Sequence, residues 1–221
     1  MCTESSARAG IDPGCVLVLI AGYPGTGKSR LSAQLQDRLG PFTAVALDDV
    51  KEELYDREGF VDATAKAQLD RAALEIFLAR VRRALAGGEP VLAEYPFSEK
   101  QRSALESASH DFGYRVVTVR MVADFEVLFE RQRLRDLDPS RHLGHLVDAF
   151  RPGDTLADRR DAPQLLTLDV FLDRYLHRGY GDFALGEVIE VDTTVFDQVD
   201  DDALIARIAR ALAQDRTGAE S

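Results

Sequence analysis

The chain has 221 residues, of which 45% are hydrophobic and 29% are charged, and its formal net charge at pH 7 is −11. This length fits one domain with a complete core, and the composition is that of an ordinary globular protein. The excess of acidic residues argues against a protein whose main task is to coat nucleic acid or an anionic membrane, because cationic surfaces bind such partners. Any phosphate site is therefore expected to be local.

The domain is expected to span residues 15–214, with residues 1–14 as a flexible polar leader and residues 215–221 as a flexible tail. The longest apolar run covers residues 15–21, far short of the ~20 residues that cross a bilayer. We therefore expect a cytoplasmic protein with no membrane partner.

The apolar pattern alternates between strand-like and helix-like periods. A β-branched and leucine run at 16–20 is typical of a buried parallel strand, and leucines four residues apart predict a helix that ends at Leu39. Ser98 and Gln101 form a capping box that opens a later helix. Further strands are predicted at 42–47, 90–93, 115–121 and 188–191, and further helices at 50–55, 69–85, 124–136 and 204–212. This alternation predicts an α/β fold: a parallel five-stranded sheet with helices on both faces.

Residues 137–186 interrupt that alternation. They are rich in Arg, Asp, His, Gly and Pro, and they include a helix-like stretch at 168–176. We expect this segment to form a helical lid and a connecting segment.

The stretch from Gly22 to Ser29 reads GYPGTGKS and matches the phosphate-binding loop pattern G-x-x-x-x-G-K-[ST], between a predicted strand and a predicted helix. Its backbone N–H groups and the following helix N-terminus favour anions. The pattern predicts ATP and Mg²⁺ as cofactors, with Lys28 on the β- and γ-phosphates and Ser29 on Mg²⁺. The other expected nucleotide-binding residues are Gly22, Tyr23, Pro24, Gly25, Thr26 and Gly27.

Two aspartates follow the second predicted strand, at the sheet edge where ligands bind in open α/β sheets. A carboxylate there can accept the proton of a hydroxyl that attacks the γ-phosphate. We favour Asp48 as this base over Asp49, and expect one of the two to cap the helix that begins at Val50. A Walker B strand of an AAA-type motor is the alternative, but that strand normally lies farther along the chain.

Three more residues are candidates for contacts with the acceptor substrate or the metal. Lys51 can hold an anionic or polar group, or it is simply solvated. Glu94 ends the third predicted strand, where it can orient a Mg²⁺-bound water or bind substrate. Tyr95 can wall the acceptor pocket, although core packing also explains it.

Arg131 and Arg135 lie four residues apart and therefore share a helix face. They are candidate catalytic cations for the transferring phosphoryl group; surface ion pairs are the alternative. His142 lies in the RHLGH stretch and is expected to contact phosphate or substrate from the lid. Thr193 follows the fifth predicted strand and is expected to line the base pocket, or to form a turn.

Four stretches together resemble the AAA_33 type of small P-loop kinases, which is similar to the polynucleotide 5′-kinase and zeta-toxin groups. They are the loop at 22–29, LDDVKEEL at 47–54, VLAE at 91–94 and ERQRLR at 130–135. The resemblance implies Lys28 and Ser29 on phosphate and Mg²⁺, Asp48 as base and an arginine of the 131–135 helix as lid cation. Lys51 departs from the family pattern, where arginine is usual, and Glu94-Tyr-Pro replaces a commoner stretch that contains aspartate or asparagine.

The sequence thus predicts an ATP- and Mg²⁺-dependent kinase that acts on a hydroxyl of a small molecule, such as a sugar, a nucleoside or an antibiotic-like natural product. A kinase for nucleic-acid 5′-hydroxyl ends and a nucleotide-binding switch or ATPase are the alternatives. The net charge makes nucleic acid the less favoured partner.

Overall fold

The computed structural model describes residues 14–213. Its sheet has five parallel strands in the order β2-β3-β1-β4-β5, which confirms the predicted α/β fold. Leu17 at the centre of the sheet pairs with Val91 on one side and Val116 on the other. The strands are β1 (Val16–Gly22), β2 (Thr43–Ala46), β3 (Val91–Glu94), β4 (Arg115–Val122) and β5 (Glu187–Asp192).

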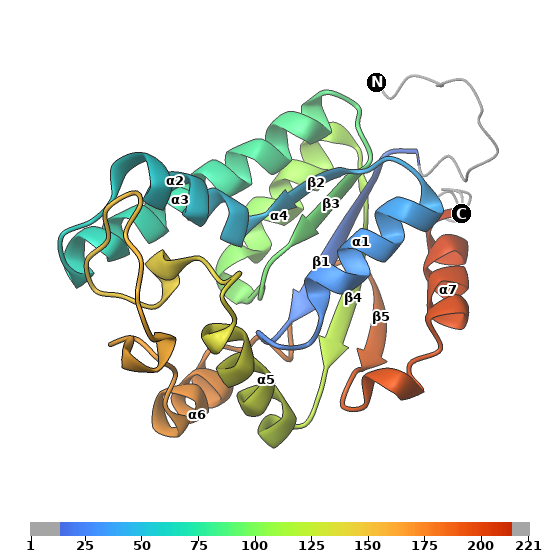
Figure 1. Cartoon of the computed structure of the whole chain (residues 1–221). Coiled ribbons are helices and arrows are strands. Elements are labelled where there is room, and N and C mark those ends of the chain that lie inside the picture. The colour runs from blue at the N-terminus through green and yellow to red at the C-terminus, as the bar shows by residue number, and fades with distance from the viewer. Residues whose placement is uncertain (1–13, 214–221) are drawn as a thin grey trace.

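Helices cover both faces of the sheet (Figure 1). Alternate residues of β1 enter opposite cores: Val16 and Val18 pack with α1 (Lys28–Leu39) and α7 (Asp201–Ala213). Leu17 and Leu19 pack with α2 (Leu47–Glu58), α3 (Ala63–Ala86) and α4 (Glu99–Phe112). Because both faces are buried, β1 reads as an uninterrupted apolar run.

Residues 137–186 form the irregular segment that the sequence predicts, between α5 (Phe125–Leu137) and β5. This segment contains two short 3₁₀ turns, at 143–145 and 159–161, and the helix α6 (Leu168–His177). In Figure 1 it lies with α5 at the end of the sheet toward which the strand arrows point. An isolated bridge between Phe60 and Phe150 attaches it to the turn after α2.

Two helix starts differ from the sequence prediction. The second strand ends at Ala46, and Leu47 already begins α2, whose N-cap position is Ala46. Asp48 and Asp49 therefore lie in the first turn of α2, and neither is the cap. Their carboxylates interact favourably with the helix dipole instead. The long helix α3 begins at Ala63, because the side chain of Asp62 accepts a hydrogen bond from the Ala65 amide.

Other details agree with the sequence prediction. The capping box at the start of α4 is present, with the Ser98 amide 3.0 Å from Gln101 Oε1. The predicted tail and all but the last residue of the predicted leader lie outside the described residues. Within residues 14–213, no helix is both long and apolar enough to cross a membrane.

Candidate active site

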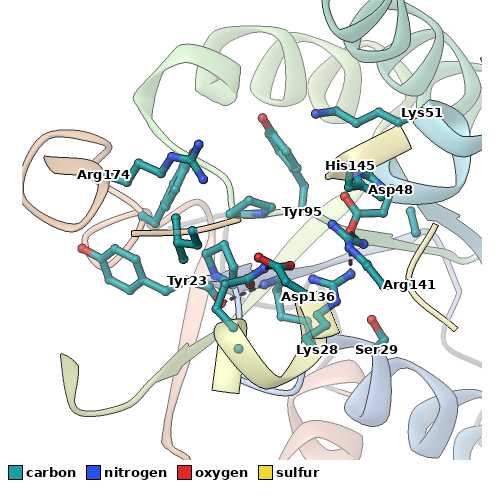
Figure 2. Close-up of a pocket in the computed structure, with 18 of the residues that line it drawn as sticks. Tyr23, Lys28, Ser29, Asp48, Lys51, Tyr95, Asp136, Arg141, His145 and Arg174 are labelled. Atoms are coloured by element: carbon teal, nitrogen blue, oxygen red, sulfur yellow. Dashed lines mark hydrogen bonds and ion pairs between the residues drawn. The ribbon is translucent and has the colours of Figure 1, made fainter. Parts of the chain in front are cut away.

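A cavity of about 830 Å³ opens at the carboxyl edge of the sheet, and we call it the central cavity. The loop at 22–29, the starts of α1, α2 and α3, the end of β3, the helix α5 and the 137–186 segment all contribute lining residues. Figure 2 shows their side chains converging on the cavity from these elements. Its size suits a small-molecule site.

The phosphate-binding loop joins β1 to α1 at the floor of this cavity. Lys28 is 8% exposed, and its Nζ donates to the carbonyls of Gly22 (3.1 Å) and Tyr23 (2.9 Å). Burial lowers the pKa of Lys28 to about 8. Gly27 has φ +86°, and a Cβ there would lie 2.8 Å from the Phe196 ring, so this turn requires glycine.

Two further polar side chains of the loop, Thr26 and Tyr23, are held by main-chain carbonyls. Thr26 is fully buried, its hydroxyl donates to the Tyr23 carbonyl (2.9 Å), and it is not among the residues that line the central cavity. The Tyr23 hydroxyl donates to the Tyr175 carbonyl (2.9 Å), and the two rings stack with centroids 4.6 Å apart. The second residue of the loop is therefore fixed to α6.

Ser29 and Glu94 form a hydroxyl–carboxylate pair beside Lys28. Ser29 Oγ donates to Glu94 Oε1 at 2.6 Å, and burial raises the pKa of Glu94. Two oxygen donors next to a phosphate-binding loop fit Mg²⁺, which takes few protein ligands and completes its shell with water and phosphate oxygens. Residues 14–213 hold no cluster of three or more His, Cys, Asp or Glu side chains that could bind a metal by themselves.

Asp48 faces the cavity from the first turn of α2 and forms ion pairs with two arginines. Arg135 Nη2 and Arg141 Nη1 both contact its Oδ2, at 2.7 and 3.1 Å. Burial raises the pKa of Asp48, but the charges of Arg141 and Arg135 outweigh burial and hold it well below its usual range. No hydrogen bond within the described residues reaches Oδ1, which leaves that oxygen for a ligand.

The RHLGH stretch docks on an acidic face of α2, and we call this contact the α2 clasp. It joins Arg141 to Asp48 and Glu52 (3.1 and 3.7 Å), His145 to Glu52 (2.9 Å) and His142 to Asp56 (3.0 Å). A Cβ on Gly144 would lie 2.6 Å from the Tyr55 ring, so glycine permits the close approach. Burial lowers the pKa of His145.

His142 does not line the central cavity, whereas His145 does. The reason is packing, because the His142 ring lies 5.1 Å from the Phe150 ring and 5.9 Å from the Tyr55 ring, behind the clasp. A substrate contact for His142 stays a prediction.

The far wall of the cavity is also polar. Lys51 Nζ lies 3.3 Å from Asp70, which also accepts a hydrogen bond from the Tyr55 hydroxyl. Lys66 donates to two carbonyls of the RHLGH region, those of His145 (3.2 Å) and Val147 (3.1 Å). Tyr95 stands between this wall and the loop, and burial raises its pKa to about 12.

Arg131 and Arg135 share a helix face as predicted, but they have different partners. Arg131 donates to the carbonyls of Thr193 (2.8 Å) and Thr194 (3.1 Å) and lies 3.7 Å over the Phe196 ring. Of these two arginines, Arg135 is the one that contacts Asp48. The Thr193 hydroxyl is buried and donates to the Val122 carbonyl at 3.0 Å. Thr193 is not among the residues that line the central cavity, but it lines a small second pocket with Gly27 and Phe196, so its place at the base pocket stays a prediction.

Several cavity residues were not selected from the sequence, among them Glu52, Lys66, Asp70, Asp136 and Arg174. Spacing gave a usable signal for one group: Asp48, Glu52 and Asp56 are four residues apart and therefore form an acidic stripe on α2. The other residues reach the cavity only through the packing of α3, α5 and α6.

Comparison with known proteins identifies relatives at the levels of family and fold. The AAA_33 family model, described as "AAA domain", matches residues 17–152. No curated protein matches the chain. A candidate kinase from Chloroflexus aurantiacus superimposes with a TM-score of 0.70 at 24% identity, over 90% of this chain and 98% of that one.

Two further solved structures share the fold more distantly. One is a sugar kinase from Janibacter sp. HTCC2649 (TM-score 0.52, 13% identity, 90% of this chain and 99% of that one). The other is a gluconokinase from Sinorhizobium meliloti 1021 (TM-score 0.51, 17% identity, 90% and 95%). At these identities the likeness concerns the fold alone.

Proposed function

Because the chain belongs to the AAA_33 family, we propose that it is an ATP- and Mg²⁺-dependent kinase that transfers the γ-phosphate to a hydroxyl of a small molecule. The observation that carries the proposal is Asp48 Oδ1, a carboxylate oxygen with no hydrogen-bond partner among residues 14–213, in the cavity that also contains Lys28 and the Ser29–Glu94 pair. The kinase names of the structural neighbours accord with it.

Each residue has a defined task in this reaction. The loop amides and Lys28 bind the phosphates, and Ser29 and Glu94 would hold Mg²⁺, which neutralises phosphate charge and orients the triphosphate when bound. Asp48 Oδ1 accepts a hydrogen bond from the acceptor hydroxyl and takes its proton as the oxygen attacks phosphorus. Arg135 and Arg141 reach the same place and stabilise the charge that develops on the phosphoryl group.

The 137–186 segment would act as the lid of this site. Its Arg141 and His145 come from the α2 clasp, and Arg174 and Tyr175 come from α6, so the segment reaches both sides of the cavity. Closing such a segment excludes water, which would otherwise compete with the acceptor hydroxyl.

A transfer assay tests the proposal. The full chain is incubated with γ-labelled ATP, Mg²⁺ and a panel of sugars, nucleosides, antibiotics and 5′-hydroxyl oligonucleotides. Label should move to a small molecule, and Lys28→Ala should abolish transfer while Lys100→Ala, an exposed lysine on α4, leaves it unchanged. Transfer to oligonucleotides alone would overturn the small-molecule assignment. Steady hydrolysis of ATP with no transfer would indicate an ATPase or a switch.

A further inference from the structure

Asp136 is a buried carboxylate of the central cavity that the proposed reaction does not use. It is 5% exposed and lies near the end of α5. In the view of Figure 2 it stands between Tyr95 and Lys28. No cation within the described residues forms a salt bridge with it. This distinguishes it from Asp48 and Glu52, which are both ion-paired in the same cavity.

Asp136 is held so that one oxygen remains available. Gln132, one turn earlier on α5, donates its amide to Asp136 Oδ1 at 2.8 Å. No hydrogen bond within the described residues reaches Oδ2. Three side-chain polar atoms of these residues are fully enclosed and lack a partner, namely Gln132 Oε1, Arg141 Nε and Arg159 Nη1. Asp136 Oδ2 is not one of them. Oδ2 is therefore accessible at the cavity wall.

A buried carboxylate with a single neutral donor is costly to the fold, because the charge loses its water and gains no ion pair. Burial raises the pKa of Asp136. The neighbouring arginines do not relieve this cost by contact, since Arg135 and Arg141 both turn to Asp48. An unfavourable group of this kind, inside a cavity, is typical of a binding site whose ligand supplies the missing partner.

The partner of Oδ2 must donate a hydrogen bond. A ligand phosphate or carboxylate placed there would meet a carboxylate that has no cation in contact, whereas a hydroxyl or a protonated amine would satisfy it. The nucleotide phosphates are assigned to the loop and Lys28. The ribose hydroxyls of ATP can donate as well, and the KM for ATP of an Asp136 variant separates them from a donor of the other substrate.

We infer that Asp136 binds a hydrogen-bond-donating group of the phosphoryl acceptor, and that the acceptor is a polyol or amino-polyol without an anionic group at this position. Gln132 is a positioning residue that fixes the orientation of the carboxylate. The inference rests on the proposed kinase function and specifies its substrate class.

The test uses the full chain, labelled ATP, Mg²⁺ and acceptors in matched groups. Neutral polyols are D-glucose, D-galactose, D-ribose and myo-inositol; D-glucosamine is the amino counterpart; D-gluconate, D-glucuronate and shikimate carry a carboxylate. Transfer should favour a neutral or amino member, and the ratio of D-glucosamine to D-glucose turnover tells whether an ammonium or a hydroxyl meets Asp136. Preferred transfer to an acid overturns the inference but leaves the kinase proposal intact.

The variant Asp136→Asn keeps the shape and removes the charge. It should raise the KM for the best acceptor by about tenfold, the loss expected when a hydrogen bond to a charged group is weakened, and leave the KM for ATP unchanged. Glu126→Gln is the matched control, because it removes a charge from an exposed position of the same helix outside the cavity.

A structural role would give a different result. Because Asn can still accept from Gln132 and no longer buries a charge, the melting temperature of unliganded Asp136→Asn should equal or exceed that of the wild type. An unchanged acceptor KM, or a lower melting temperature with equal losses for ATP and acceptor, overturns the inference. Hydrolysis of ATP without transfer to any compound rejects the kinase proposal and this inference together.

Discussion

At the scale of single residues, the proposed reaction gives Asp48 two tasks on its two oxygens. Oδ2 binds Arg135 and Arg141, and Oδ1 is the oxygen proposed to meet the acceptor. The ion pairs keep the carboxylate ionised at any working pH, which a hydrogen-bond acceptor for a hydroxyl requires. Asp49, its neighbour in the sequence, also lines the cavity, but it is exposed and forms no ion pair with Arg135 or Arg141.

Replacing Asp48 by Asn should lower kcat by about 10²- to 10⁴-fold, because the amide cannot take a proton. The dissociation constant for ATP should change little, since the loop holds the phosphates. Steady-state kinetics and a nucleotide titration measure the two effects. Asp49→Asn is the matched control and should retain activity; if it alone loses activity, Asp49 is the base.

Lys28 gives nucleotide binding a pH dependence. Its pKa of about 8 in the free protein means that it loses its proton as the pH rises through 8. The triphosphate requires the charged form, so affinity for ATP should fall by about tenfold per pH unit above that value. Titrations between pH 7 and 10 measure the slope. Lys28→Arg stays charged throughout this range and should bind with a flat pH profile; an equal decline in both proteins would contradict the assignment.

At the scale of elements, the α2 clasp links a helix to an irregular segment through arginine ion pairs and histidine–carboxylate hydrogen bonds one turn apart. Glu52 receives both His145 and Arg141, whereas Asp56 pairs with His142 outside the cavity. Each carboxylate therefore has a histidine partner, but only Glu52 of the two lines the central cavity.

We expect Glu52→Gln to lower kcat/KM by about tenfold or more, because it loosens Arg141 and His145 together. Asp56→Asn should have an effect of less than about fivefold, since an exposed charged contact contributes at most about 1 kcal/mol. Comparing kcat/KM and melting temperature for the two variants tests this. Equal losses of activity would mean that the clasp only stabilises the fold.

The elements also show how far sequence reasoning reaches. The five strands, the flanking helices and the loop at 22–29 follow from local patterns, and these patterns were confirmed. The partners of Arg131 and His142 could not be predicted from local patterns. Arg131 contacts Thr193, and His142 contacts Asp56, only because tertiary packing brings these distant residues together. Thr193 illustrates the same limit: its position after β5 is readable, but the direction of its hydroxyl is not.

At the scale of the whole molecule, the net charge of −11 coexists with a cavity that gathers cations. Lys28, Arg135 and Arg141 come from α1, α5 and the 137–186 segment. Both arginines form ion pairs with Asp48. The sequence predicted a local rather than a general phosphate site, and the fold places these cations together. Composition could not predict the compensating carboxylates, because their pairing depends on how α2 and α5 face each other.

The bond between Tyr23 and Tyr175 spans 152 residues of sequence. Contacts of such separation form late in folding, because a long stretch of chain must be ordered before its ends can meet. The loop at 22–29 lies in the first strand–helix unit, yet its final shape depends on Tyr175 in α6, far along the chain. In a refolding experiment, helical signal in far-UV circular dichroism should appear before binding of a fluorescent ATP analogue. Tyr23→Phe removes the hydrogen bond and should lengthen the interval between the two, whereas simultaneous appearance in both proteins would indicate that the loop matures with the sheet.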